Sequence, residues 1–209
     1  MKYKYISWEA AVELSMRLSK LVLSEYSPDC IIAISRGGLV TARIISDFSG
    51  VEDVYSIKAS LWGVGGRVSD DVVIRDTKLP ISGLKVLIVD DVVDTGLTLS
   101  RVVDYVYRFS PSDVRTAVLH VKPTSRYVPN YYVDKLSEWV WVIYPWTTCE
   151  VVSAVIYKEL GCNALKLSSD DIVTKFHELT GVDIDSTLYK DFIHIALRHY
   201  LSKLCRNRG

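Results

Sequence analysis

Short apolar runs alternate with helix-like patterns along the first two thirds of the chain. Apolar runs of about four to eight residues are typical of strands buried on both faces of a sheet. Apolar residues at helical spacing predict the helices between them. The predicted strands are 30–35, 53–60, 85–90 and 114–121, and the predicted helices are 7–26, 39–48 and 97–109. We therefore expect an α/β fold, with a central, mostly parallel twisted sheet flanked by helices.

The last third of the chain changes to an aromatic strand and a set of helices. Residues 138–146, EWVWVIYPW, predict the strand. Gly161 and Gly181 are expected to end two of the helices, and Ser168 with Asp171 has the pattern of a capping box. The helices are predicted at 151–160, 172–179 and 186–204.

The segment 61–83 carries Gly63, Gly65 and Gly66, two charge clusters and Pro80. This composition predicts a long loop, with a hairpin inside it as an alternative. Loops of this length inside a compact domain are usually functional lids or disordered segments. The glycines suit both, so the sequence leaves the two alternatives open.

The chain has 25 basic and 25 acidic residues among 209. This balance gives no global attraction to nucleic acid or to an anionic membrane. No stretch approaches the roughly 18 apolar residues of a membrane span, and the first residues predict an amphipathic helix rather than a signal peptide. The four cysteines lie far apart in sequence, which favours reduced thiols over a disulfide or metal framework. We expect a cytoplasmic protein with no membrane partner.

Three carboxylates follow the apolar strand in the segment 86–100, VLIVDDVVDTGLTLS. Asp90, Asp91 and Asp94 stand at the carboxyl end of the strand, where open parallel sheets bind their ligands. The following turn has Gly96 between hydroxyl side chains, which suits a phosphate at a helix N-terminus. The adjacent carboxylates suit ribose hydroxyls or, through water, Mg²⁺. The alternative is that these residues only cap the helix and face solvent.

The same segment resembles a signature of a known family. VLIVDDVVDTGLTL resembles the ribose-phosphate motif of the type I phosphoribosyltransferases, and IIAISRGGLVTARIIS is similar to their pyrophosphate loop. VKPTS, followed by WVWVIYPW, is similar to the purine end of the xanthine/guanine-type 6-oxopurine members. The resemblance covers 31–146. It implies an α/β domain at 1–150 with a small purine-binding hood at about 122–148, and it leaves 151–209 as a C-terminal helical extension.

The resemblance implies an enzyme, a pentosyltransferase of purine salvage. Such an enzyme transfers the phosphoribosyl group of 5-phosphoribosyl-1-pyrophosphate (PRPP) to guanine, hypoxanthine or xanthine. The products are pyrophosphate and the nucleoside 5′-monophosphate: GMP, IMP or XMP. Mg²⁺ is the implied cofactor, and we expect a homo-oligomer, either a dimer or a tetramer.

Carried over position by position, the resemblance assigns the PRPP site. Asp90 and Asp91 would bind the ribose hydroxyls and the metal, and Asp94 would act near N7 of the purine as general base or electrostatic partner. The residues that bind the 5′-phosphate would be Thr95, Gly96, Leu97 and Thr98. Arg36 and Gly37 would bind the pyrophosphate. We expect bound PRPP and Mg²⁺, rather than partners in the chain, to offset the three carboxylates. At least one of their pKa values should then be raised in the empty site.

At the base end, the resemblance implies that Lys122 donates to O6 of the purine. Trp141 would stack on the base, and Val142 would meet it through its backbone. An ammonium group only donates hydrogen bonds, so it suits a 6-oxo group and cannot accept from a 6-amino group. The alternatives are a strand-end lysine that reaches solvent and a tryptophan of a core strand. Period-two alternation would place Trp139 on the same face as Trp141.

The resemblance also implies that the loop 61–80 closes over the site and excludes water. Ser60 and Arg67 are its candidate contact residues. Two positions depart from the family pattern: Leu61 follows Ser60 where relatives often have tyrosine, and Thr147 follows Pro-Trp where relatives often have an acidic residue. The second departure leaves the preference among guanine, hypoxanthine and xanthine open.

Two other classes of function remain as alternatives. A PRPP- or nucleotide-sensing regulator on the same fold would bind RNA or DNA and would usually show a basic face or an added DNA-binding unit. The balanced charge argues against a nucleic-acid partner. An interaction module with a decayed motif would have little reason to keep all three aspartates.

Overall fold

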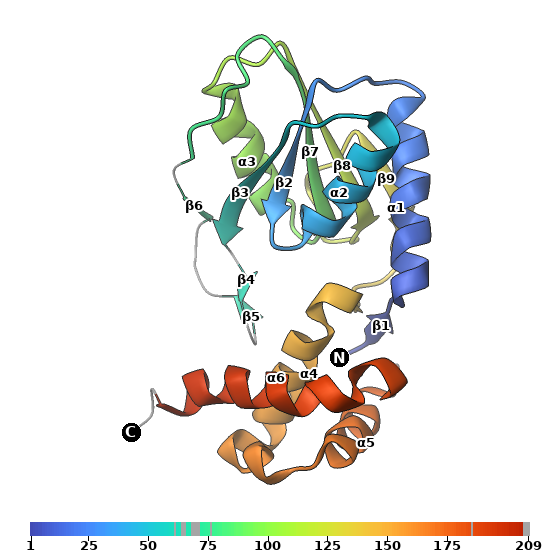
Figure 1. Cartoon of the computed structure of the whole chain (residues 1–209), viewed down its shortest axis with the longest axis vertical. Coiled ribbons are helices and arrows are strands. Elements are labelled where there is room, and N and C mark those ends of the chain that lie inside the picture. The colour runs from blue at the N-terminus through green and yellow to red at the C-terminus, as the bar shows by residue number, and fades with distance from the viewer. Residues whose placement is uncertain (61, 64–65, 68–71, 76, 185, 207–209) are drawn as a thin grey trace. The chain divides into compact units, whose positions relative to one another are not determined.

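The structure is a computed structural model that describes residues 1–60, 62–63, 66–67, 72–75, 77–184 and 186–206. The chain forms two compact units (Figure 1), each treated by itself below. The sheet unit is built chiefly from residues 9–60 and 72–139, and the helical unit chiefly from 1–8 and 140–206. None of the helices in the described ranges has the length and apolar character needed to cross a bilayer.

A six-stranded sheet forms the centre of the sheet unit. The strands lie in the order β6-β3-β2-β7-β8-β9, and all neighbours are parallel except β3 and β6. The strands are β2 (Cys30–Ser35), β3 (Val54–Ser60), β6 (Val73–Ile74), β7 (Lys85–Val93), β8 (Asp113–Val121) and β9 (Tyr131–Lys135). The first five residues of β2 are buried, as expected of an inner strand of a parallel sheet. The predicted, mostly parallel sheet is confirmed.

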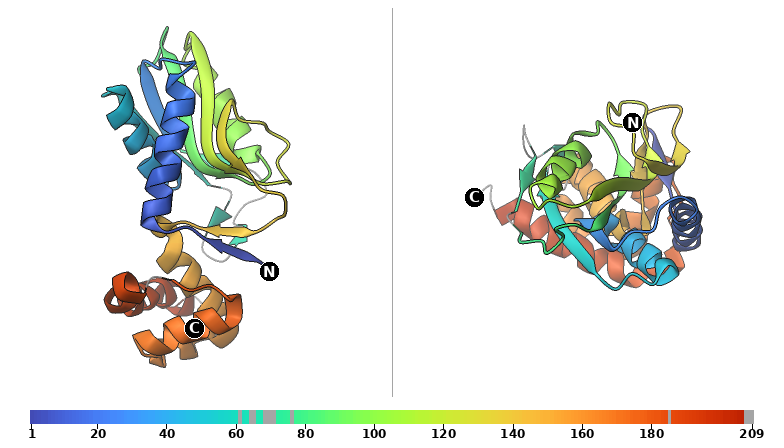
Figure 2. Two further views of the ribbon diagram at one scale, coloured as in Figure 1. Left: turned by 90° about the vertical axis from the view of Figure 1, so that its right-hand side faces the viewer. Right: turned by 90° about the horizontal axis from the view of Figure 1, so that it is seen from above.

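Helices cover both faces of this sheet (Figure 2). α3 (Leu97–Tyr107) lies on one face, and α1 (Trp8–Leu23) and α2 (Gly38–Ser49) lie on the other. Each helix buries an apolar stripe against the strands, because apolar side chains three to four residues apart share one helical face. The buried apolar residues of α1 are Ala11, Leu14, Leu18 and Val22, and those of α3 are Leu99, Val102, Tyr105 and Val106. The predicted α/β class is confirmed.

The helical unit has an apolar core of its own, which includes Ile156, Phe176 and Leu197. Strand β1 (Tyr3–Tyr5) pairs in parallel with β10 (Trp141–Ile143). The helical elements are η1 (Pro145–Thr147), α4 (Thr148–Leu160), η2 (Gly161–Lys166), α5 (Ser169–Thr180) and α6 (Ser186–Arg206). The glycines after α4 and α5 and the capping box before α5 stand where the sequence predicts them.

The aromatic segment 138–146 is mostly not a strand. Only Trp141–Ile143 forms β10. Trp139 precedes it on irregular backbone, and Pro145 opens a 3-10 turn, because proline has no N–H to continue a ladder. The prediction of a strand over the whole segment is therefore wrong, as is the common strand face for Trp139 and Trp141.

Three short strands lie in the described part of the segment predicted as a long loop, and one of them, β6, pairs with β3. β4 (Trp62–Gly63) and β5 (Gly66–Arg67) pair with each other, so the hairpin alternative is confirmed. Of the two candidate contact residues, Ser60 ends β3 and Arg67 ends β5. Their side chains, and residues 61, 64–65, 68–71 and 76, lie outside the described part of the structure.

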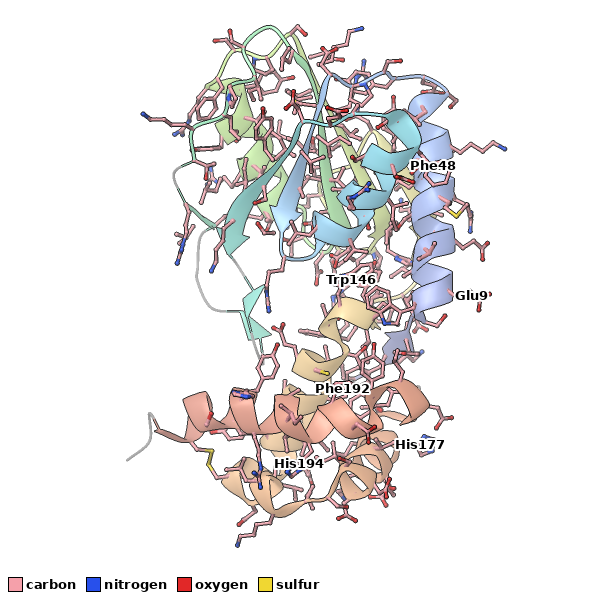
Figure 3. All side chains as sticks on the ribbon, viewed as in Figure 1. Glu9, Phe48, Trp146, His177, Phe192 and His194 are labelled. Atoms are coloured by element: carbon pink, nitrogen blue, oxygen red, sulfur yellow. A yellow bond between two sulfur atoms is a disulfide. The ribbon has the colours of Figure 1, made fainter. Side chains whose placement is uncertain are left out.

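Two of the four cysteines form a disulfide bond. Cys162 of η2 and Cys205 of α6 are joined at an S–S distance of 2.07 Å (Figure 3), whereas Cys30 and Cys149 are free thiols. The bonded residues are 43 positions apart, and only the packing of the helical unit brings them together. The expectation of reduced thiols is therefore wrong for this pair.

Candidate active site at the carboxyl ends of the strands

The loop after β2 passes very close to the end of β7. A Cβ atom at Gly37 would lie 2.6 Å from both carboxylate oxygens of Asp91, and one at Gly38 would overlap the carbonyl oxygen of Val89. Asp91 is only 7% exposed. Because β2 and β7 are neighbours in the sheet, only residues without a side chain allow this approach. The structure thus places Gly37, of the predicted pyrophosphate loop, against Asp91.

Asp90 and Asp91 lie on opposite faces of the sheet, because successive side chains of a strand alternate. Asp91 faces the loop of Gly37, whereas Asp90 lies on the α3 side, as Ile88 does. Oδ1 of Asp90 accepts the backbone N–H of Asp91 at 2.9 Å. Burial and the neighbouring charge of Asp91 raise the pKa of Asp90 well above its ordinary value. The expectation of at least one raised pKa among the aspartates is confirmed.

The turn between β7 and α3 has the geometry of an anion site. Gly96 has a φ of +87°, in the left-handed region, and a Cβ atom there would lie 2.5 Å from Cβ of Tyr127. α3 begins at the next residue, and the first turn of a helix presents N–H groups that the helix itself does not pair. The four predicted phosphate residues lie together at this N-terminus: Thr95, Gly96, Leu97 and Thr98.

Asp94 is the centre of a hydrogen-bonded cluster. Nζ of Lys122 donates to its Oδ2 at 3.0 Å, and Oγ1 of Thr124 donates to its Oδ1 at 2.8 Å. Nε1 of Trp139 lies 3.3 Å from each of the two carboxylate oxygens. Nζ of Lys122 also lies 4.2 Å from the centroid of the Trp139 ring, within the range of a cation–π contact.

The charge of Asp94 is therefore offset within the chain, and the expectation that ligand and metal would do so is wrong for this residue. Asp94 follows β7 and Lys122 follows β8, and these strands are neighbours in the sheet. The backbone N–H of Lys122 donates to Val93 at 2.9 Å, which fixes the two strand ends side by side. The sequence could not show this contact, because it joins residues 28 positions apart.

Sequence reasoning also missed Trp139. The family resemblance directed attention to Trp141 as the tryptophan of the base site, and the predicted strand over 138–146 gave Trp139 no separate role. The one sequence signal for Trp139 is its indole N–H, a donor that usually finds a partner when it is partly buried.

Residues 5–150 match the family model of the phosphoribosyl transferase domain. The chain belongs to the phosphoribosyltransferase family. It is 30% identical over 161 residues to the xanthine-guanine phosphoribosyltransferase of Gluconobacter oxydans, which covers 76% of this chain and 93% of that protein. It is also 30% identical over 116 residues to the hypoxanthine-guanine phosphoribosyltransferase of Aquifex aeolicus, covering 53% of this chain and 65% of that protein.

A solved structure agrees with this assignment. The purine phosphoribosyltransferase from Pyrococcus horikoshii is similar with a TM-score of 0.60 and 32% identity, over 70% of this chain and 95% of that one. The predicted phosphoribosyltransferase-like fold is confirmed. The family match ends at residue 150, so η2, α5 and α6 lie beyond it.

The remaining predicted residues of the phosphoribosyltransferase lie in two places. Arg36 begins the loop after β2, and the peptide bond between Ser35 and Arg36 is cis. Trp141 and Val142 belong to β10 of the helical unit, where both pair with β1 and Trp141 packs in part against that unit's core. The structure thus joins Lys122 to Asp94 within the sheet unit and places the other two predicted base residues in the helical unit.

Two carboxylates of the phosphoribosyltransferase suit a divalent metal. Within the described ranges, no group of three or more His, Cys, Asp or Glu side chains could hold a metal ion. Mg²⁺ in phosphate-handling sites usually takes only one or two protein carboxylates, together with water and substrate phosphates. Asp90 and Asp91 lie on opposite faces of the sheet, so each by itself fits a site of this kind with one carboxylate. A bound cation would also favour the ionised form of Asp90, whose pKa burial raises.

Proposed function

We propose that this phosphoribosyltransferase acts on 6-oxopurines in purine salvage. It transfers the 5-phosphoribosyl group of PRPP to guanine, hypoxanthine or xanthine, giving the nucleoside 5′-monophosphate and pyrophosphate. The observation that carries the proposal is the 3.0 Å ion pair between Lys122 and Asp94. Lys122 supplies a hydrogen-bond donor and Asp94 an acceptor, and Asp94 lies two residues before Gly96 of the phosphate turn. Relatives named xanthine-guanine and hypoxanthine-guanine phosphoribosyltransferases support the same substrate class.

In this proposal, PRPP is bound at both of its charged ends. The N-terminus of α3, with Gly96, takes the 5′-phosphate, and the loop of Arg36 and Gly37 takes the pyrophosphate. The ribose hydroxyls bind Asp90 and Asp91. Mg²⁺ is the proposed cofactor at one of these two carboxylates, where it would offset the negative charge of the leaving pyrophosphate.

The reaction exchanges one bond at C1′ of the ribose. The C1′–O bond to pyrophosphate breaks with its electron pair on the leaving group, and a purine nitrogen forms the new C1′–N bond. Positive charge develops on the ribose, so the enzyme mainly positions groups and stabilises charge. The proton that the purine loses moves to the carboxylate of Asp94, which Thr124 and Trp139 hold in place.

Lys122 selects the base through its O6 atom. Its ammonium group has donors and no acceptor, so it pairs with a carbonyl oxygen and not with an amino group. When the base binds, Nζ turns from Asp94 to O6, and a hydrogen bond to substrate takes the place of the ion pair. Trp141 is proposed to stack on the purine, and Val142 to bind it through its backbone.

The proposal extends to the wider molecule. Ser60 and Arg67 are the proposed PRPP contacts from the segment that follows β3. Exposed apolar side chains on α6, Phe192 (Figure 3) and Ile195 among them, support a homo-oligomer, a dimer or a tetramer, which light scattering would measure.

The proposed enzyme is cytoplasmic and has no nucleic-acid partner. Its catalytic domain is 1–150 and 151–209 is the helical extension.

A panel of bases tests this function. The purified chain, with PRPP and Mg²⁺, is offered guanine, hypoxanthine, xanthine, adenine, uracil or orotate, and pyrophosphate release is measured. We expect turnover of at least one 6-oxopurine, and rates at least about a hundredfold lower with adenine, because adenine leaves Lys122 without an acceptor. No turnover of any 6-oxopurine, together with tight binding of RNA or DNA, would instead favour a PRPP-sensing regulator.

A further inference from the structure

Trp139 contacts both charged groups of the base site. Its indole N–H reaches both carboxylate oxygens of Asp94, at 3.3 Å each, and its ring lies 4.2 Å from Nζ of Lys122. The side chain is half-buried and lies on the irregular segment after β9. Trp139 is therefore distinct from Trp141, which lies two residues on in β10 of the other unit.

We infer that Trp139 is a positioning residue that holds Asp94 while Lys122 exchanges Asp94 for the O6 atom of the base. The inference rests on the proposed function. As Nζ turns to the substrate, Asp94 loses its ion-pair partner and would be able to rotate. The indole N–H and the hydroxyl of Thr124 keep the carboxylate oriented during this exchange.

The two contacts of Trp139 act differently. The indole N–H is a donor only and carries no charge, so it binds the carboxylate without repelling the nearby ammonium. The ring face attracts the ammonium through its quadrupole, which keeps Nζ close to the site after it leaves Asp94. Loss of the N–H should therefore affect the step that uses Asp94, and loss of the ring should affect binding of the base.

Two variants separate these contacts. Trp139→Phe removes the N–H and keeps a ring, and it should lower kcat for hypoxanthine roughly 10- to 100-fold, the effect of one hydrogen bond to a charged group. The KM for PRPP should stay unchanged. Trp139→Leu removes both contacts and should in addition raise the KM for hypoxanthine. Trp8→Phe, at an exposed tryptophan of the helical unit, is the matched control and should leave both constants unchanged.

A double-mutant cycle shows whether Trp139 acts through Asp94. In an Asp94→Asn background, Trp139→Phe should change kcat less than about twofold, because the group that it positions is already lost. The same fold loss in both backgrounds would overturn the inference, since a merely structural effect is independent of Asp94. An unchanged kcat for Trp139→Phe in the otherwise wild-type chain would overturn it as well.

Further measurements keep these outcomes distinct from misfolding and from failure of the function. Trp139→His keeps a ring N–H and should recover part of the kcat that Trp139→Leu loses; a histidine variant no better than leucine counts against the inference. Thermal unfolding of each variant identifies any loss of fold. A wild-type chain that turns over no 6-oxopurine would contradict the proposed function itself, before any variant is compared.

Discussion

Lys122 and Asp94 form an ion pair at 3.0 Å across the neighbouring ends of β8 and β7. Their side chains are only 6% and 18% exposed, so the opposite charges of the two residues offset each other where little water reaches them. Removing one partner of a buried pair leaves an uncompensated charge, which destabilises the fold. Variants of either residue therefore change stability as well as catalysis, and both have to be measured.

Asp94→Asn should cut turnover at least about a hundredfold, the scale of a lost general base. The amide cannot take the proton of the purine, although its oxygen can still accept from Trp139 and Thr124. Binding of GMP, followed by calorimetry, should be largely retained. An unchanged rate would remove Asp94 from its proposed role.

Lys122→Met should weaken the discrimination between 6-oxo and 6-amino bases. The methionine keeps most of the length of the side chain and removes its donors, so kcat/KM for hypoxanthine should fall roughly 10- to 100-fold. The ratio of kcat/KM for hypoxanthine to that for adenine is the quantity to measure. Lys135→Met, at an exposed position at the end of β9, serves as the control. The proposed contact with O6 is wrong if the ratio is the same in Lys122→Met and wild type.

Gly96→Ala should weaken PRPP binding, whereas the matched control variant Gly83→Ala should not. Gly96 and Gly83 both have positive φ, +87° and +77°, but a Cβ atom would collide with Tyr127 only at Gly96 and would meet open space at Gly83. Both alanines should lower the free energy of unfolding by about 1–2 kcal/mol, the cost of the left-handed conformation, and the collision with Tyr127 should add to this loss at Gly96. Only Gly96→Ala should raise the KM for PRPP. Equal KM values in the two variants would argue against the phosphate turn.

The parts of the site that follow from local sequence were predictable, and the contacts between segments were not. The turn at Gly96 lies directly between a strand and a helix, so the order of residues alone places it. The approach of Gly37 to Asp91 and the cluster of Lys122, Trp139 and Asp94 depend on which strands are neighbours and on their register. The disulfide bond has the same origin, because it joins helical elements that are distant in sequence.

The raised pKa of Asp90 predicts a stability that falls as pH rises. Burial and the charge of Asp91 raise this pKa in the folded state, so the folded chain binds more protons than the unfolded chain between the ordinary and the raised value. The contribution of Asp90 to the free energy of unfolding is therefore at its maximum at pH values below the ordinary pKa. It decreases as the pH rises and is lost once the pH passes the raised pKa of the folded state. Without Mg²⁺, the Tm of Asp90→Asn should rise relative to that of wild type as the pH increases above the ordinary pKa of an aspartate. A difference in Tm that does not vary with pH would contradict this assignment.

Reduction of the bond between Cys162 and Cys205 should destabilise the helical unit without changing the chemistry at Asp94. The bond closes a loop of 43 residues, and the chain-entropy model gives a stabilisation of roughly 3–4 kcal/mol for a loop of this length. Cys162→Ser should therefore lower the Tm by several degrees, and wild type in reductant should match it. Cys149→Ser, at a free thiol of the same unit, is the control, and its Tm should still fall in reductant.

At temperatures well below unfolding, kcat should be the same in wild type, Cys162→Ser and Cys149→Ser, because the acid–base group and its hydrogen-bond partners belong to the sheet unit. A Tm that reductant leaves unchanged in wild type would show that the bond does not form in solution.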